Sequence, residues 1–244
     1  AERFARIPAW LDVVVGMGLA SLLLFGHPFI AVSTALFFGF DLINRRRWLD
    51  AAIGGTDGAY LNAVRDYTRA LEGRNALLKT DRPQEDAIRA FEKTMLAPAT
   101  LMVETRAKVL PELATTLREA CGRAGFPDKG ADLAYLPDTP ADQLADTWAR
   151  LRGVDQATGS TLKGPQRDDF GILFGGQDAA DYASEGQQRL LVLALCLGRL
   201  SRDASRAPTP PVILADDVLG ELDDTRRRAF WQEVGETHQV IATG

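Results

Sequence analysis

Two adjacent carboxylates, Asp216 and Asp217, follow the apolar residues 212–215 near the end of the chain. These apolar residues predict a buried strand, and in open α/β sheets ligands bind at the carboxyl ends of the strands. A carboxylate at that edge can hold Mg²⁺, and its neighbour can orient or deprotonate an attacking water. Two acids after an apolar strand also occur as a helix cap or a turn, so the pair alone leaves both interpretations open.

A second candidate site is the segment 182–189, which precedes the apolar run 190–197. Ser184 can cap the N-terminus of a helix, and Gly186 lets a phosphate approach the backbone of its first turn. Free N–H groups and the helix dipole favour an anion at such a point. The same residues also suit a simple capped core helix. A short acidic turn that ends at Asp223 follows the two carboxylates along the chain.

The order and spacing of these three segments resemble those of an ABC-type ATPase. They look like the signature motif, the Walker B motif and the D-loop of the heads that SMC proteins and RecF share. The RecF family in particular is suggested by the signature, which has the family's SxGQxR form, and by three other stretches. These are residues 46–50 (RRxxLD), Tyr67 with residues 74–79 (Y…RNxLLK), and residues 158–169 (TGxTxxGPHRDD). Together the matches extend from Arg45 to the end of the chain.

The resemblance implies an α/β fold in which an ABC-ATPase-like lobe, a mixed sheet with flanking helices, carries an inserted all-helical lobe. RecF-like proteins are ATP-dependent DNA-binding proteins of recombinational gap repair and replication restart, and they act with RecO and RecR to load a recombinase. The implied cofactors are ATP and Mg²⁺, with ATP sandwiched between the two heads of an ATP-gated homodimer. The implied DNA is single-stranded or a gapped duplex, and the implied location is the cytoplasm.

The resemblance also implies a role for each residue of the three motifs. Asp216 and Asp217 would be catalytic, Asp216 as the Mg²⁺ ligand and Asp217 as the group that positions the attacking water. Many ABC ATPases carry Glu in place of Asp217, so the shorter side chain predicts slow hydrolysis. Asp223 in the D-loop would report across the dimer interface. The signature would bind the nucleotide of the opposing subunit through Ser184, Glu185, Gly186 and Gln187.

The sequence departs from the family pattern at several points. No G-x-x-x-x-G-K-[ST] motif occurs, so the Walker A loop that cradles the phosphates is missing from these 244 residues. Gln166 stands where the family usually has His. The chain opens at Ala1 without a Met and its last residues resemble a strand cut short. We therefore expect a fragment that is inactive alone, and a weak ATPase for the full-length protein.

Residues 13–40 contain no charged side chain and are numerous enough to cross a bilayer. The basic residues 45–47 that follow would suit a membrane anchor. Several glycines and Pro28 divide the run into pieces of strand length, which favours burial in an α/β core. We therefore expect residues 1–44 to be an atypical, very apolar remnant of the ATPase lobe. A membrane-associated protein with an ABC-like portion, or another SMC-like head, is the alternative.

The remaining sequence predicts a helical lobe over residues 45–155 and the signature and Walker B half of the ATPase lobe over residues 156–244. The helical lobe shows apolar residues at spacings of three or four, the pattern of amphipathic helices. One such stripe consists of Tyr60, Val64, Tyr67 and Leu71.

Other elements are predicted from local signals. A long helical pattern covers residues 84–121, where Pro98 and Pro111 should kink or divide the helix. A capped helix is expected over residues 138–151, and a β-hairpin over residues 170–183.

Charge and cysteine usage narrow the function classes. With 28 Lys and Arg against 33 Asp and Glu, the formal net charge of −5 excludes a protein whose whole surface attracts nucleic acid. Two cysteines far apart in apolar contexts, Cys121 and Cys196, exclude a disulfide framework and a zinc ligand set, and they indicate a reducing compartment.

A local basic cluster nevertheless lies at the start of the helical lobe. Phosphate contacts from such a cluster would be independent of DNA sequence and sensitive to salt. The alternative is a solvated helix face with balancing acids, in which Arg46 pairs with Asp50 four residues later. The candidate DNA contacts are Arg45, Arg46, Arg47, Arg65, Arg69, Arg74 and Lys79.

Overall fold

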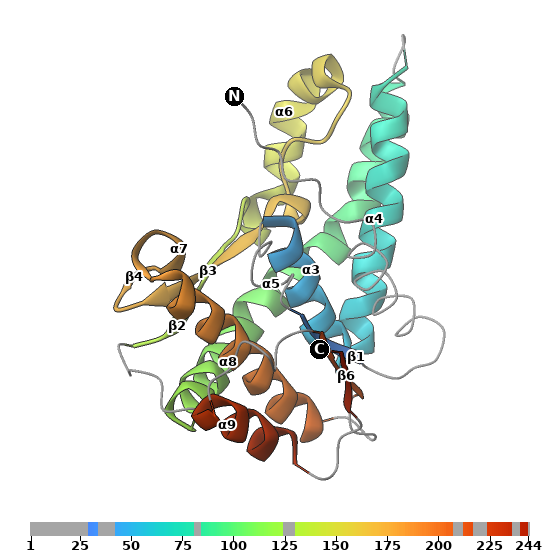
Figure 1. Cartoon of the computed structure of the whole chain (residues 1–244). Coiled ribbons are helices and arrows are strands. Elements are labelled where there is room, and N and C mark those ends of the chain that lie inside the picture. The colour runs from blue at the N-terminus through green and yellow to red at the C-terminus, as the bar shows by residue number, and fades with distance from the viewer. Residues whose placement is uncertain are drawn as a thin grey trace. The chain divides into compact units, whose positions relative to one another are not determined.

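The structure is a computed structural model of the chain, shown in Figure 1. Two compact units divide the chain: unit 1 comprises residues 1–44, 113–132 and 172–244, and unit 2 comprises residues 45–112 and 133–171. Unit 2 begins where the helical lobe was predicted to begin, but residues 113–132 fall in unit 1 and residues 156–171 in unit 2. The structure describes residues 29–33, 42–80, 84–123, 130–206, 212–216, 224–235 and 240–243.

A parallel sheet forms part of unit 1. Its strands are β1 (Phe29–Ser33), β5 (Val212–Asp216) and β6 (Val240–Thr243), in the order β1-β5-β6. Both neighbours of β5 run parallel to it, and this is the environment in which short apolar runs form strands. In this register Asp216 lies opposite Ser33 on one side and Thr243 on the other, so the three residues share one edge of the sheet.

The described part of unit 1 also contains the helices α7 (Ala179–Tyr182), α8 (Glu185–Ala204) and α9 (Asp224–Val234), together with the end of α5 (Glu85–Arg123). Every residue of α8 from position 191 to 200 is buried. Gly198 lies so close to α5 that an added Cβ would stand 2.7 Å from the carbonyl oxygen of Thr116. The apolar residues that follow Ser184 in the sequence therefore form a buried helix, which packs closely against α5.

Helix α5 (Glu85–Arg123) is a single helix of 39 residues that contains both Pro98 and Pro111. Of the two expected effects of the prolines, a kink or a division, the division does not occur. The buried residues Met95, Ala99, Leu110 and Leu113 continue along one face past both prolines. Burial of this continuous apolar stripe compensates for the backbone hydrogen bonds that the prolines cannot donate.

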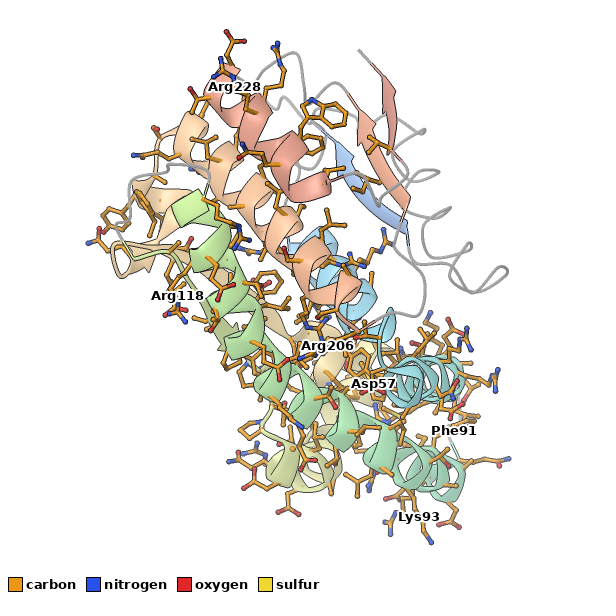
Figure 2. The ribbon with its side chains drawn as sticks, turned by 90° about the horizontal axis from the view of Figure 1, so that it is seen from below. Asp57, Phe91, Lys93, Arg118, Arg206 and Arg228 are labelled. Atoms are coloured by element: carbon orange, nitrogen blue, oxygen red, sulfur yellow. The ribbon has the colours of Figure 1, made fainter. Side chains whose placement is uncertain are left out.

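Unit 2 is built from α3 (Leu42–Gly54), α4 (Gly58–Leu78), the first part of α5, and α6 (Leu144–Thr158). The side chain of Asp57 caps α4 by accepting a hydrogen bond from Tyr60 N. Figure 2 labels Asp57 at the start of α4 and Phe91 on α5. A Cβ added at Gly73 of α4 would stand 2.5 Å from the Phe91 ring, so glycine permits this close contact between the two helices. Two of the predicted stripe residues, Tyr60 and Tyr67, are buried.

Short elements complete the described part of the chain. The strands β2 (Asp132–Leu136), β3 (Asp169–Phe174) and β4 (Gln177–Asp178) form a sheet in the order β2-β3-β4, with β3 and β4 antiparallel. The 3₁₀ turns η1 (Ala141–Gln143) and η2 (Pro165–Arg167) flank α6.

Two local predictions need correction. The β-hairpin is shorter than expected, because residues 179–182 form α7 after Asp178 caps them by accepting from Ala180 N. Residues 45–155, which were expected to be wholly helical, contain the strand β2.

Most of the apolar stretch 13–40 lies outside the described residues, and its described piece, Phe29–Ser33, is β1. No helix in the described ranges combines the length and apolarity that crossing a bilayer requires.

Candidate functional site

The N-terminus of α8 is a well-defined turn centred on Ser184. The backbone of Ser184 is extended, with φ −62° and ψ 156°, and its hydroxyl accepts a hydrogen bond from Gln187 N at 3.4 Å. In return, Oε1 of Gln187 accepts from Ser184 N at 2.9 Å. This reciprocal capping box confirms Ser184 as the N-cap. Ser184, Glu185 and Gly186 are exposed, so solvent reaches the helix start.

Helix α7 leads into this turn and is attached to α8. Gln188 in the first turn of α8 donates from Nε2 to the carbonyl oxygens of Ala183, at 2.9 Å, and Ala180, at 3.2 Å. The backbone that enters the Ser184 turn and the helix that leaves it are therefore linked by one side chain.

One of the acidic candidates, Asp216, lies in the parallel sheet of the same unit. Asp216 is the last residue of β5, at the carboxyl edge of a parallel sheet, where ligands bind in open α/β folds. Asp217 and Asp223 lie outside the described residues, so their predicted roles stay predictions. Within the described ranges, no group of three or more His, Cys, Asp and Glu side chains is arranged to hold a metal ion.

The predicted DNA-contacting residues have three different environments. Arg74 is fully buried, with 0% of its side chain exposed, so it cannot contact a phosphate and its assignment is wrong. Arg45 pairs with Asp169 at 2.8 Å, and Arg46 donates to the carbonyl oxygen of Asp168 at 3.4 Å. The exposed candidates are Arg47, Arg65, Arg69 and Lys79.

A buried ionic network around Arg106 lies within unit 2. Its guanidinium donates to Asp50 at 2.8 Å, to Asp168 at 2.8 Å and to the carbonyl oxygen of Pro165 at 2.8 Å. The Tyr60 hydroxyl accepts from Nε of Arg106 at 2.9 Å and itself donates to Asp50. Asp50 therefore binds Arg106 and Tyr60, and does not form the expected ion pair with Arg46.

The pKa values of this network follow from burial and charge. Burial raises the pKa of Asp168, and the opposing effects of Arg106 and a hydrogen bond from Tyr135 do not cancel the increase. Burial also raises the pKa of Tyr135, and the charge of Asp168 adds to this shift. For Arg106, burial lowers the pKa, but the combined effect of Asp50, Tyr60 and Asp168 is larger and raises it. The pKa therefore lies above its ordinary value, and the guanidinium stays charged.

A second network in unit 2 surrounds Arg74. Arg74 donates to Asp155 at 2.8 Å, to the Thr161 hydroxyl at 2.6 Å and to Glu92 at 2.8 Å. Asn75 accepts from both the backbone N–H and the hydroxyl of Thr161, at 2.8 and 2.7 Å. The consecutive residues Arg74 and Asn75 thus hold the loop after α6 in place.

Gln166 occupies a defined place in that loop. It accepts a hydrogen bond from the Tyr67 hydroxyl and donates from Nε2 to the carbonyl oxygens of Thr161, at 3.1 Å, and Lys163, at 3.2 Å. Gly164 beside it has φ 132°, a conformation that favours glycine. The Gln166 amide can bind all three partners at once, because its oxygen accepts and its nitrogen donates hydrogen bonds.

Sequence reasoning missed Arg106, Tyr135 and Asp155. The available signal for Arg106 was indirect: Asp50 lies between apolar residues on both sides, and a buried acid implies a buried cation. Arg106 comes from a helix 56 residues after Asp50, so no local spacing identifies it as the partner.

Known proteins resemble this chain over most of its length. It is 33% identical over 193 residues to the DNA replication and repair protein RecF of Geobacter sp. (strain M21), a match that covers 75% of this chain and 52% of the relative. It is 37% identical over 196 residues to RecF of Herpetosiphon aurantiacus, covering 75% and 50%. A third relative, RecF of Synechocystis sp., is 30% identical over 219 residues, covering 82% and 57%. The resemblance to the RecF family is confirmed.

Solved RecF structures extend the comparison to the fold. The recombination mediator protein RecF with ATP, in the RecFOR pathway, matches with a TM-score of 0.79 and 25% identity, over 89% of this chain and 62% of that one. The same protein with ATPrS matches with a TM-score of 0.77. These matches confirm the predicted fold class. The chain spans about half the length of the curated RecF relatives, and no family model matches it.

Proposed function

We propose that this chain is part of an ATP-dependent DNA-binding protein of recombinational gap repair and replication restart. In this proposal the protein works as an ATP-gated homodimer that helps load a recombinase, with RecO, RecR and DNA as partners, in the cytoplasm. The observation that carries the proposal is the open, capped turn at Ser184, which belongs to the same compact unit as the acidic edge of β5.

The chemistry of the Ser184 turn suits a terminal phosphate. The hydroxyl acts as an acceptor in the capping box, so its proton stays available for a phosphate oxygen. The first N–H groups of a helix have no acceptor within that helix, and the helix dipole favours an anion there. Nothing lies within 4 Å of a Cβ built on Gly186, so the approach to the backbone is open. We infer that this turn meets the γ-phosphate held by the opposing subunit.

The acidic edge suits the proposed Mg²⁺. Mg²⁺ keeps several waters and is usually held by one or two carboxylates plus phosphate oxygens, so a single residue such as Asp216 is a fitting protein ligand. When bound, this ion would neutralise charge on the transferring phosphate. In the proposal Asp217 orients the attacking water and Asp223 contacts the opposing subunit.

Proposed DNA contacts are restricted to the basic residues that solvent can reach. Arg47 extends from α3, Arg65 and Arg69 extend from α4, and Lys79 follows the end of α4. Contacts from these side chains would go to phosphates and would weaken as salt increases.

A substitution pair at Ser184 in the full-length protein tests the proposal. Ser184→Arg places a bulky side chain over the helix start, and Ser184→Asp keeps a good N-cap but presents a negative charge to the phosphate. We expect both variants to lose ATP-dependent dimerisation in sedimentation with a non-hydrolysable ATP analogue. Only the Arg variant should also lose stability, by about 1 kcal/mol.

The alternative interpretation of Ser184, a simple helix cap, predicts a different result. In that case Ser184→Asp would behave as wild type in both stability and association. A Ser184→Asp variant that dimerises at the wild-type ATP concentration would overturn the proposed phosphate contact.

A further inference from the structure

Two adjacent glutamines hold the Ser184 turn through hydrogen bonds of opposite polarity. The Gln187 side chain is an acceptor, since its Oε1 accepts from Ser184 N at 2.9 Å. The Gln188 side chain is a donor, since its Nε2 donates to Ala183 O at 2.9 Å and to Ala180 O at 3.2 Å. The same residue type therefore serves two distinct chemical requirements at consecutive positions.

This geometry distinguishes side chains that bind the protein's own backbone from residues left open at the helix start. The side chain of Gln187 turns back onto the backbone of Ser184 and is engaged there. Gln188 spans the junction between α7 and α8. Ser184 and Gly186, in contrast, are exposed at the helix start, and the hydroxyl proton of Ser184 is not used by the capping box.

We propose that Gln187 and Gln188 are positioning residues, which set the conformation of the Ser184 turn by accepting and by donating hydrogen bonds, respectively. This inference rests on the proposed function of the turn. It gives Gln187 a role different from that of the signature residues that meet the phosphate.

The same substitution at the two positions tests this inference, because Glu is an acceptor and cannot donate when ionised. Gln187→Glu retains the acceptor and forms the usual Ser-x-x-Glu capping box. Gln188→Glu loses both donated bonds and places a carboxylate against two carbonyl oxygens. Both variants add the same charge at neighbouring residues, so each is the control for the other.

The measurement is the concentration of a non-hydrolysable ATP analogue that gives half-maximal dimerisation of the full-length protein, followed by sedimentation. We expect Gln188→Glu to need at least about tenfold more nucleotide than Gln187→Glu, because the two variants share the added charge and only Gln188→Glu loses its hydrogen bonds. Gln187→Ala, which removes the acceptor without adding charge, should need more nucleotide than wild type. Gln188→Ala removes the donors without adding charge and should fall between wild type and Gln188→Glu. Melting temperatures establish that each variant is folded.

Three results would overturn the inference. If Gln187 is a phosphate ligand, Gln187→Glu will impair dimerisation more than Gln188→Glu does. If charge alone matters, the two Glu variants will be equally impaired. If Ser184→Arg, measured in parallel, still dimerises with nucleotide, the proposed function fails and this inference fails with it. If Ser184→Arg loses dimerisation and either of the first two results is also seen, the positioning role is rejected but the proposed function stands.

Discussion

At Arg106 a single guanidinium joins residues from two of the stretches that resemble RecF. Asp50 belongs to the first stretch, and Pro165 and Asp168 belong to the last. Motif residues of this kind are easily taken for ligands of DNA or nucleotide. Here their side chains and carbonyl groups are used to close the core of unit 2, and the same applies to Arg74.

Removing the charge of Arg106 should be costly. Arg106→Met leaves Asp50 and Asp168 without their common cation, and breaking a buried ion pair in this way typically costs about 3–5 kcal/mol. We expect a loss of this size in the free energy of unfolding, measured by urea denaturation at pH 8. Arg118→Met is the matched control on the same helix (Figure 2), because 47% of the Arg118 side chain is exposed. It should change stability by less than about 0.5 kcal/mol.

The loss in Arg106→Met should also depend on pH. Burial already raises the pKa of Asp168, and removal of Arg106 takes away an influence that lowers it. A carboxyl group with a raised pKa in the folded state destabilises the protein when ionised, and this cost disappears as pH falls through that pKa. The difference between wild type and Arg106→Met should therefore be smaller at pH 5 than at pH 8. An equal difference at both pH values would show that Asp168 does not carry the cost.

At the scale of elements, the tight contact between α8 and α5 gives a prediction about glycine. Gly198→Ala would place a Cβ 2.7 Å from the carbonyl oxygen of Thr116, so backbone must move, at a cost of about 1–3 kcal/mol. Gly153→Ala in α6 has nothing within 4 Å of the new Cβ. That change should stabilise the protein by about 0.5–1 kcal/mol, because Ala favours helix over Gly. Thermal denaturation of the two variants should show shifts of opposite sign; a stabilised Gly198→Ala would contradict the packing.

Sequence patterns predicted some elements better than others, for physical reasons. The helical stripes of α4 and α5 were recognisable because burial repeats every three or four residues over many turns. The cap at Ser184 was recognisable because capping is local in sequence. Residues 179–182 were mistaken for a strand, because the cap from Asp178 decides their conformation within a single turn. The two arginine networks were missed because their acids lie up to 81 residues away along the chain.

At the scale of the whole molecule, nucleotide binding should need more than these 244 residues. The sequence has no Walker A loop, whose backbone N–H groups and Lys provide most of the contacts to the phosphates. We therefore expect the isolated chain to bind ATP only weakly, with no saturation at micromolar concentrations in calorimetric titration. A full-length RecF measured in parallel provides the positive control, and micromolar binding by the isolated chain would contradict the prediction.

The division of the chain between the two units has a consequence for synthesis on the ribosome. All residues of unit 2 have been made once residue 171 is added, whereas unit 1 also needs residues 172–244. Strand β1 pairs with β5, which is made about 180 residues later. The helical unit can thus fold while the chain is still growing, and β1 must stay unpaired with β5 until residues 212–216 have been made. A chaperone that binds short apolar segments would have its longest opportunity at residues 29–33.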